Sequence, residues 1–169
     1  MPFTLRPHQT EALRAMASTR IGQIIVPTGG GKTIMGIMDV VRTLDASTTP
    51  QTIVVVAPRI LLAQQLCEEY MEILSDRFAN IIPAHIHSGS TPHFSTTNVT
   101  KIHLFEKMME TAQLHRIYFT TYHSLPRLAE AGISVDGIYF DEAHNSTRND
   151  FYPAVKYFSQ TERRCFFFT

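Results

Sequence analysis

Short apolar runs alternate along this chain with longer stretches in which apolar residues recur three or four positions apart. Nearly uninterrupted apolar runs indicate β-strands, and apolar residues at helical spacing indicate helices that bury one face. The runs predict strands at 24–26, 53–57, 84–87, 117–120, 137–141 and 165–168. The spaced residues predict an opening helix at 8–18 and further helices that include 34–44, 62–73 and 102–112.

Strands that are apolar on both faces are typical of a mostly parallel sheet whose connecting helices cover both of its faces. The segments 45–51 and 88–100 are rich in Ser, Thr and Pro and are predicted to be loops. No internal repeat and no long linker divides the chain. We therefore expect an α/β fold in a single domain that spans residues 1–169.

Composition limits the class of protein. With 169 residues, 44% of them hydrophobic and 18% charged, the chain is long enough for one well-buried domain. Fifteen basic and fifteen acidic side chains leave no overall positive field, so a nucleic-acid partner would have to bind local patches. No apolar run approaches the roughly 20 residues that span a bilayer, and the N-terminus lacks the apolar stretch of a signal peptide. We expect a soluble, intracellular protein.

Cysteines and histidines offer no obvious metal site in the sequence. Cys67 and Cys165 each stand alone in an apolar pattern, so we expect both to pack as reduced side chains. His85 and His87 share one face of a predicted strand, and with His93 they could be interpreted as metal ligands. Because no cysteine or acidic ligand stands near them in the sequence, packing within the strand is the preferred interpretation.

A glycine-rich segment follows the first predicted strand and precedes a predicted helix. Its glycines allow positive φ and close approach of backbone N–H groups to a phosphate, and the helix N-terminus adds a favourable dipole. The lysine near its end would neutralise β- and γ-phosphate oxygens, and the hydroxyl that follows would bind Mg²⁺. The predicted nucleotide-binding residues of this segment are Pro27, Thr28, Gly29, Gly30, Gly31, Lys32 and Thr33.

Two adjacent carboxylates, Asp141 and Glu142, stand at the end of the strand predicted at 137–141. Parallel strands end at a common edge of the sheet, so Asp141 would reach a magnesium ion held near the glycine loop. Glu142 beside it can orient the water that attacks a γ-phosphate. A solvated acidic pair that caps a turn is the simpler alternative. Together, the loop and the carboxylates predict nucleotide hydrolysis.

Both segments resemble ATPase motifs of the superfamily 2 helicases and translocases. Residues 27–33 resemble motif I, although Val26 stands where that family has Ala or Gly, and residues 141–144 resemble the DEAH box of motif II. The resemblance implies a RecA-like P-loop NTPase domain, with ATP and Mg²⁺ as its ligands.

The same resemblance assigns roles to individual residues. It implies that Asp141 holds Mg²⁺ through water, that Glu142 is the general base, and that His144 couples the site to motion. The implied catalytic residues are Lys32, Asp141 and Glu142, and the implied metal ligands are Thr33 and Asp141.

Residues 5–9 resemble the Q motif of these proteins, in which a glutamine amide both donates to and accepts from the adenine edge. Gln9 is the corresponding residue and is expected to favour ATP over GTP. Residues 57–65 resemble motif Ia, and residues 120–125 resemble the Thr-Tyr-x-Ser-Leu segment, two loops that hold nucleic-acid phosphates in the family. The residues expected to contact nucleic acid are Arg59, Ser88 and Thr121.

Simpler structural interpretations of these positions also stand. Arg59 could be a surface charge at a helix start, and Thr121 could be an N-cap, and neither role excludes phosphate binding.

The resemblance extends from Leu5 to Thr169, where motif III of the family would begin. It implies the first of two RecA-like domains of an ATP-dependent DNA or RNA helicase, with the second domain and its arginine fingers outside this sequence. DNA is favoured, because the segments look more like those of restriction-type and repair-type motors.

Three other functions are open. One is a translocase subunit of a restriction or remodelling assembly that does not separate strands. The second is a small-molecule kinase that shares the phosphate loop, and the third is a nucleic-acid-binding module that does not hydrolyse ATP. On its own, this domain is expected to hydrolyse ATP very slowly.

Overall fold

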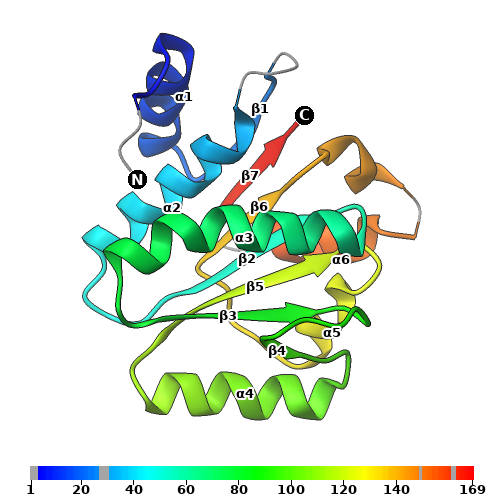
Figure 1. The fold of residues 1–169 in the computed structure, drawn as a ribbon. Helices are drawn as coiled ribbons and strands as arrows, with labels where there is room; N and C mark the ends of the chain where they lie inside the picture. The colour runs from blue at the N-terminus through cyan, green and yellow to red at the C-terminus, as the bar shows by residue number, and fades with distance from the viewer. Residues whose placement is uncertain (1–3, 27–30, 149, 161–162) are drawn as a thin grey trace.

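The computed structural model describes residues 4–26, 31–148, 150–160 and 163–169 of the protein. Its centre is a seven-stranded sheet with the order β1-β7-β6-β2-β5-β3-β4, and every pairing among these strands is parallel (Figure 1). The strands are β1 (Ile21–Ile24), β2 (Thr52–Ala57), β3 (Ile81–Ile86), β4 (Phe94–Ser95), β5 (His115–Thr121), β6 (Gly137–Phe140) and β7 (Arg164–Phe168).

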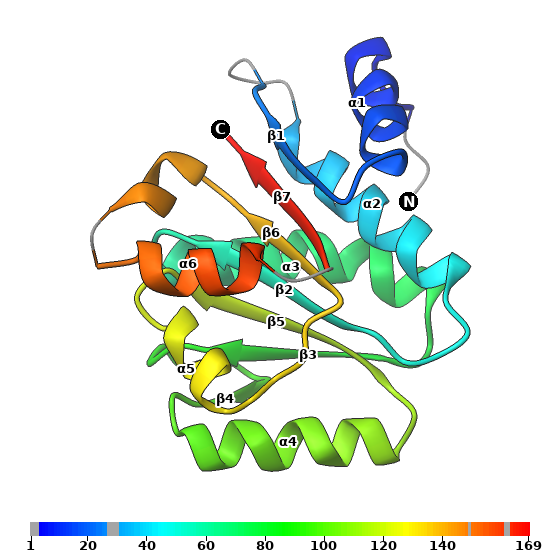
Figure 2. The same ribbon diagram turned by 180° about the vertical axis from the view of Figure 1, so that it is seen from behind.

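Helices connect the strands and cover both faces of the sheet. They are α1 (Pro7–Ala17), α2 (Lys32–Ala46), α3 (Ile60–Arg77), α4 (Val99–Thr111), α5 (Leu125–Glu130) and α6 (Tyr152–Ser159), with a 3₁₀ turn η1 (Ala143–Thr147) after β6. Helices α2 and α3 lie in front of the sheet in Figure 1, and α5 and α6 lie in front of it when the molecule is turned (Figure 2).

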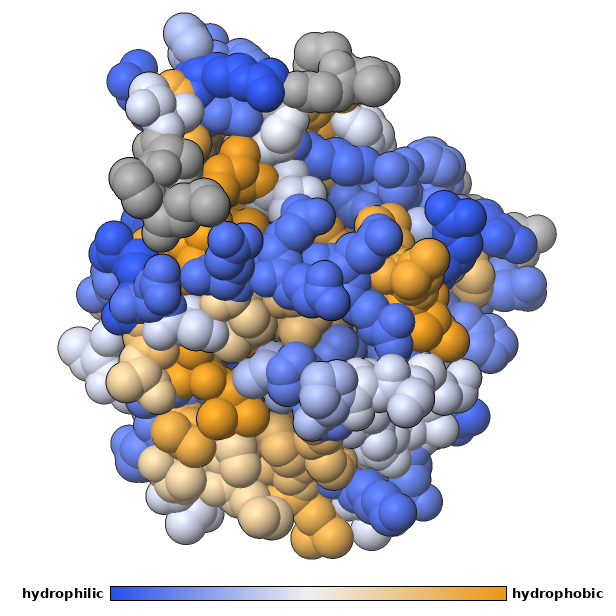
Figure 3. Space-filling model, viewed as in Figure 1, coloured by the Kyte–Doolittle hydropathy of each residue, from blue (hydrophilic) through white to orange (hydrophobic). Residues whose placement is uncertain are grey.

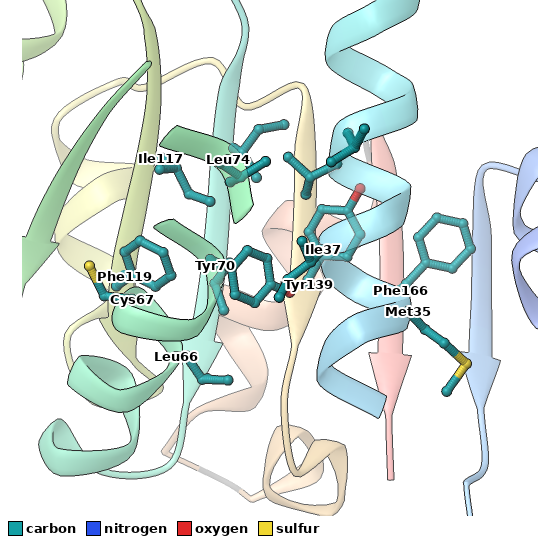
Figure 4. Close-up of a cluster of buried hydrophobic side chains, with 14 of the residues drawn as sticks. Met35, Ile37, Leu66, Cys67, Tyr70, Leu74, Ile117, Phe119, Tyr139 and Phe166 are labelled. Atoms are coloured by element: carbon teal, nitrogen blue, oxygen red, sulfur yellow. The ribbon is translucent and has the colours of Figure 1, made fainter. Parts of the chain in front are cut away.

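Alternation along the strands produces two separate hydrophobic clusters. On β2, Ile53 and Val55 join a cluster with residues of α1, α2 and α3, whereas Val54 and Val56 join a cluster with residues of α4, α5 and α6. Figure 4 shows the first cluster, in which Tyr70 of α3 packs against the sheet. Every residue of β2, β5 and β6 is buried. The prediction of a parallel sheet covered on both faces is therefore confirmed.

The boundaries of the sheet differ from the sequence prediction at its edges. Strand β1 ends at Ile24, and Ile25 is 78% exposed although it belongs to an apolar run. Among the residues that the structure describes, β1 is an edge strand that pairs with β7 alone, so one of its sides has no neighbouring strand. The two-residue strand β4 lies inside the segment predicted as a loop. Helices α5 and α6 were not predicted because six and eight residues are too few to show a helical period clearly.

A buried ion-pair network stands near the amino ends of the central strands. Arg116 of β5 donates to both carboxylate oxygens of Glu106 on α4, at 2.9 and 2.8 Å. Tyr118 and Thr52 also donate to Glu106, at 2.7 and 2.9 Å. This network satisfies a buried carboxylate far from the carboxyl ends of the strands, where the predicted functional residues lie.

Helix α4 buries Ile102 and presents apolar side chains to solvent as well. Leu104 and Met108 are exposed on this helix, and apolar side chains gather where α4 lies in the space-filling view (Figure 3). None of the described helices combines the length and apolar character needed to cross a membrane.

Candidate nucleotide site

The predicted phosphate-loop lysine and the two carboxylates meet at the carboxyl edge of the sheet. Helix α2 begins at Lys32, and Asp141 and Glu142 follow directly after β6. Lys32 Nζ donates to Glu142 Oε1 at 2.7 Å and lies 3.4 Å from Asp141 Oδ1. The hydrogen bond joins residues 110 positions apart in the sequence. The structure thus brings the two predicted segments into direct contact.

The three charged groups shift one another's protonation. The hydrogen bond from Lys32 lowers the pKa of Glu142, so this carboxyl is ionised at neutral pH. Burial raises the pKa of Asp141; the charge of Lys32 opposes this shift, and the charge of Glu142 adds to it. Burial alone would lower the pKa of Lys32, but its contacts with Glu142 and Asp141 outweigh that effect and raise it. Lys32 therefore stays a cation beside an ionised carboxylate.

Glu142 has an unusual backbone conformation that directs its side chain. Its φ of 49° and ψ of 56° lie in the left-handed region, which costs a non-glycine residue about 1–2 kcal/mol. Asn145 holds this turn, because its backbone N and its side-chain Nδ2 both donate to Glu142 O at 3.0 Å. On the other side, Asp141 N donates to Val56 O at 2.8 Å and continues the sheet ladder. The turn is fixed at both ends.

Tyr122 is a further residue of this site that the sequence did not single out. Its hydroxyl donates to Asp141 O at 2.8 Å, and its ring, 1% exposed, stacks on Phe140 and Phe151. Its backbone N donates to Ala57 O at the end of β2. Tyr122 therefore anchors the peptide that precedes Glu142. Its place in the Thr-Tyr-His-Ser-Leu segment was visible in the sequence, but the strand end that its hydroxyl reaches was not.

Gly31 and Gln9 form the contact between α1 and the start of α2. Gly31 has a φ of 71°, and a Cβ atom at this position would lie 2.3 Å from Gln9 Nε2. Gln9 is buried, and its Oε1 accepts a hydrogen bond from Arg6 N at 2.9 Å. The positive φ favours glycine at position 31, and any larger residue there would also displace the Gln9 amide. The structure places Gln9, the predicted adenine-reading residue, directly against Gly31.

The structure describes some of the remaining predicted site residues and not others. Thr33 follows Lys32 in the first turn of α2. His144 lies in η1, with its Nδ1 3.7 Å from Glu142 Oε2. The roles assigned to Thr33 and His144 stay predictions. Four loop residues lie outside the described part of the chain, namely Pro27, Thr28, Gly29 and Gly30.

The predicted nucleic-acid contacts follow three neighbouring strands at the same edge. Arg59 follows β2, Thr121 ends β5 and Ser88 follows β3, and these strands are adjacent in the order β2-β5-β3. The side chain of Thr121 is buried, and its Oγ1 accepts a hydrogen bond from Ser124 N at 3.2 Å. Arg59 and Ser88 are exposed. Thr121 therefore stabilises the turn before α5, although the N-cap of this helix is Ser124 and not Thr121. Its contact with nucleic acid stays a prediction.

Two of these loops also touch each other. A Cβ atom at Gly89 would lie 2.6 Å from Ile60 Cγ2, so the loop after β3 packs on the first residue of α3. Arg59 directly precedes that residue, and its positive charge contributes to lowering the pKa of Glu142. The loops after β2 and β3 are thus in contact, and Arg59 is near enough to the candidate nucleotide site for its charge to act on Glu142.

Cys67 and Cys165 are buried free cysteines, as the sequence predicted, and Cys67 also lies beside two histidines that are distant in the sequence. Cys67 Sγ lies 3.9 Å from His93 Nδ1, and His85 Nε2 lies 3.2 Å from the same nitrogen. Cys67 is 26 positions away from His93 in the sequence, so no local motif could have revealed this contact.

Comparisons with known proteins agree with this fold. A family model described as "Type III restriction enzyme, res subunit" matches residues 2–168. A comparison with curated proteins found no match. Two solved structures share the fold: a nuclease-deletion mutant of the type ISP restriction-modification enzyme LlaGI in complex with a DNA substrate mimic, and the ATP-dependent type ISP restriction-modification enzyme LlaBIII bound to DNA.

Both structural likenesses cover almost all of this chain but only a small part of the larger enzymes. For LlaGI the TM-score is 0.77 at 20% identity, over 99% of this chain and 17% of that one. For LlaBIII the TM-score is 0.78 at 20% identity, over 100% of this chain and 13% of that one. The match of the family model over residues 2–168 shows that the chain belongs to the type III restriction enzyme res subunit family and has its helicase-type, RecA-like domain.

Proposed function

We propose that this domain binds and hydrolyses ATP and that it drives the movement of a restriction-type motor along DNA. The observation that supports this proposal best is the contact of Lys32 with Glu142 and Asp141 at 2.7 and 3.4 Å. Residues with the chemistry for phosphate binding, metal binding and water activation meet there, at the edge of a parallel sheet where ligands bind. A small-molecule kinase would share the phosphate loop, but the carboxylate pair Asp141 and Glu142 at a strand end favours a motor ATPase.

In this proposal, ATP binding exchanges the partners of Lys32. Lys32 leaves Glu142 and neutralises the β- and γ-phosphate oxygens, while backbone N–H groups of the loop hold the phosphates. Glu142 is then released and, as an ionised carboxylate, accepts a proton from the attacking water. Until ATP binds, the hydrogen bond from Lys32 thus keeps Glu142 from accepting a proton from water.

The donor set also suits magnesium. A hydroxyl and a carboxylate are the oxygen ligands that Mg²⁺ prefers, and Thr33 and Asp141 supply them. When bound, this ion would neutralise charge that develops on the phosphates. Asp141 is held for such a role by Tyr122 and by the ladder bond to Val56.

The nucleic-acid partner proposed here is DNA. Arg59 and Ser88 are exposed at the edge of the sheet that holds the nucleotide site, and they could contact phosphates without reading bases. The type ISP enzymes of similar fold are both bound to DNA or to a DNA substrate mimic. We also propose that a second RecA-like domain completes the site with an arginine, as the helicase resemblance implies.

Isothermal titration calorimetry with Mg-ATP tests the nucleotide site. Lys32→Ala should lose most of the ATP affinity, and Lys101→Ala, on the exposed surface of α4, should keep it. Equal affinity in both variants, with both folded by circular dichroism, would refute the assignment. On the motor that contains this domain, triplex displacement without duplex unwinding would indicate a translocase, and duplex unwinding would indicate a helicase.

A further inference from the structure

Three potential metal ligands converge on the far side of α3 from the nucleotide site. They come from three elements: Cys67 from α3, His85 from β3, and His93 from the loop before β4. One ligand atom from each lies within 4.8 Å of the other two. Cys67 and His85 are buried, and His93 is exposed beside a pocket that Glu68 also lines. The cluster is thus anchored in the core and open to solvent on one side.

The spacing of these atoms is close to that of a tetrahedral zinc site. Zn–N bonds of about 2.0–2.1 Å and a Zn–S bond of about 2.3 Å place neighbouring ligand atoms about 3.3 Å (N···N) and about 3.6 Å (S···N) apart. The observed separations are 3.2 Å between His85 Nε2 and His93 Nδ1, and 3.9 Å between Cys67 Sγ and His93 Nδ1. Small rotations of the exposed His93 ring would bring the three atoms onto one ion.

Hydrogen bonds fix the protons of the histidines in the present structure. Gly89 N donates to His87 Nδ1 at 3.0 Å, so the proton of neutral His87 lies on Nε2, which faces His85 Nδ1 at 3.0 Å. The proton of neutral His85 then lies on Nε2 and points at His93 Nδ1. The rings of His85 and His93 are 3° from parallel, and this proton lies between their facing nitrogens. A metal ion would replace that proton.

Burial favours the neutral forms of these side chains. It lowers the pKa of His85 to about 4, so the ring is an uncharged ligand at neutral pH. It raises the pKa of Cys67 to about 12, so without a metal this thiol is protonated and unreactive. Cys67 lies beside Phe119 at the edge of the first hydrophobic cluster (Figure 4). A nucleophilic or redox role for Cys67 is therefore disfavoured.

We propose that Cys67, His85 and His93 bind a divalent transition-metal ion of the zinc type, with the fourth position facing the pocket that Glu68 lines. Binding displaces the thiol proton of Cys67 to solvent and leaves a metal–thiolate bond. The proton of His85 moves to Nδ1 and is donated to His87, the usual arrangement of a ligating histidine with an outer partner. His87 then carries its own proton on Nδ1, and Gly89 N–H loses its acceptor.

This exchange links the metal to the candidate DNA surface. Gly89 is next to Ser88 and packs on Ile60, so a change in its hydrogen bond alters the loop that carries Ser88. The ion would tie the segment around His93 to α3 and β3 while it releases the Gly89 amide from His87. Metal binding would thus fix the segment around His93 and change the hydrogen bonding of Gly89 in the same loop.

Cobalt(II) titration of the metal-free full chain tests the proposal, because a cobalt–thiolate bond gives a charge-transfer band and a tetrahedral site gives intense visible bands. Wild type should show both, and zinc should abolish them. Cys67→Ser should lose the charge-transfer band. Cys165→Ser is the matched control, since Cys165 is also buried with a pKa raised to about 12, and it should keep the band.

Two further measurements sharpen the test. His93→Ala removes a ligand and should weaken cobalt binding by more than the about 10–100-fold that loss of an outer partner costs. The amide signal of Gly89 in a nitrogen–proton correlation NMR spectrum should shift with zinc in wild type and in Cys165→Ser, but not in Cys67→Ser. A folded wild type without a charge-transfer band, or a band that persists in Cys67→Ser, would overturn the proposal.

Discussion

Removal of the Tyr122 hydroxyl tests whether this residue positions Glu142, the proposed general base. Tyr122→Phe keeps the ring that stacks on Phe140 and Phe151 and deletes only the donor to Asp141 O at 2.8 Å. The buried carbonyl that loses its donor costs about 1–3 kcal/mol. The free energy of unfolding measured in urea should fall by this amount.

The effect on hydrolysis follows from the strained turn beside the lost hydrogen bond. Tyr122 anchors the peptide between Asp141 and Glu142, and Glu142 has a φ of 49°. Without the anchor this peptide relaxes, and a misplacement of about 1 Å at a catalytic group costs about 10²-fold in rate. Single-turnover ATP hydrolysis with protein in excess should therefore fall about 10- to 100-fold. ATP affinity measured by calorimetry should change little, because Lys32 is not disturbed and the backbone hydrogen bond to Val56 still holds Asp141.

Tyr118→Phe is the matched control for this change. Tyr118 is also buried, and its hydroxyl donates to Glu106 at 2.7 Å in the network at the amino ends of the strands. Its loss should reduce stability by a similar amount and leave hydrolysis per folded molecule unchanged. If both variants slow hydrolysis equally, the effect is one of stability. If Tyr122→Phe hydrolyses ATP at the wild-type rate, the hydroxyl does not position Glu142.

Three further predictions concern the same site. Gln9→Ala should bind ATP and GTP with equal affinity in calorimetry, whereas wild type should prefer ATP; no preference in wild type would reject adenine reading by Gln9. Residues 1–169 by themselves should hydrolyse ATP about 10³- to 10⁵-fold below a motor that contains the proposed second RecA-like domain and its arginine, and single-stranded DNA should not stimulate phosphate release. Strong stimulation that Glu142→Gln abolishes would contradict this. Lys32 lowers the folded-state pKa of Glu142. The ion pair therefore stabilises the fold at pH values above the unfolded pKa of about 4.3, and this stabilisation is lost as the pH falls through the lowered folded-state pKa. The difference in unfolding free energy between wild type and Glu142→Gln should therefore shrink in acid, and a constant difference from neutral to acid pH would exclude the contribution of this pair.

Local patterns in the sequence determined the class of fold and the main parts of the candidate site. Burial on both faces makes a parallel strand apolar throughout, so the central strands were visible as runs such as 53–57. Phosphate binding by a loop needs consecutive residues of fixed types, which is why residues 27–33 could be predicted to form such a loop without a structure. The same holds for Asp141 and Glu142, because their chemistry depends on their place at a strand end.

Only the tertiary structure decided which of these parts meet and what surrounds them. The contact of Lys32 with Glu142 depends on the strand order, which the sequence pattern does not give. The left-handed turn at Glu142 and the hydroxyl of Tyr122 act through backbone groups that every residue type shares, so no side-chain signal marks them. Cys67 and His93 are brought together by the packing of α3 against a loop. Contacts between distant segments arise from packing, and a local pattern carries no information about them.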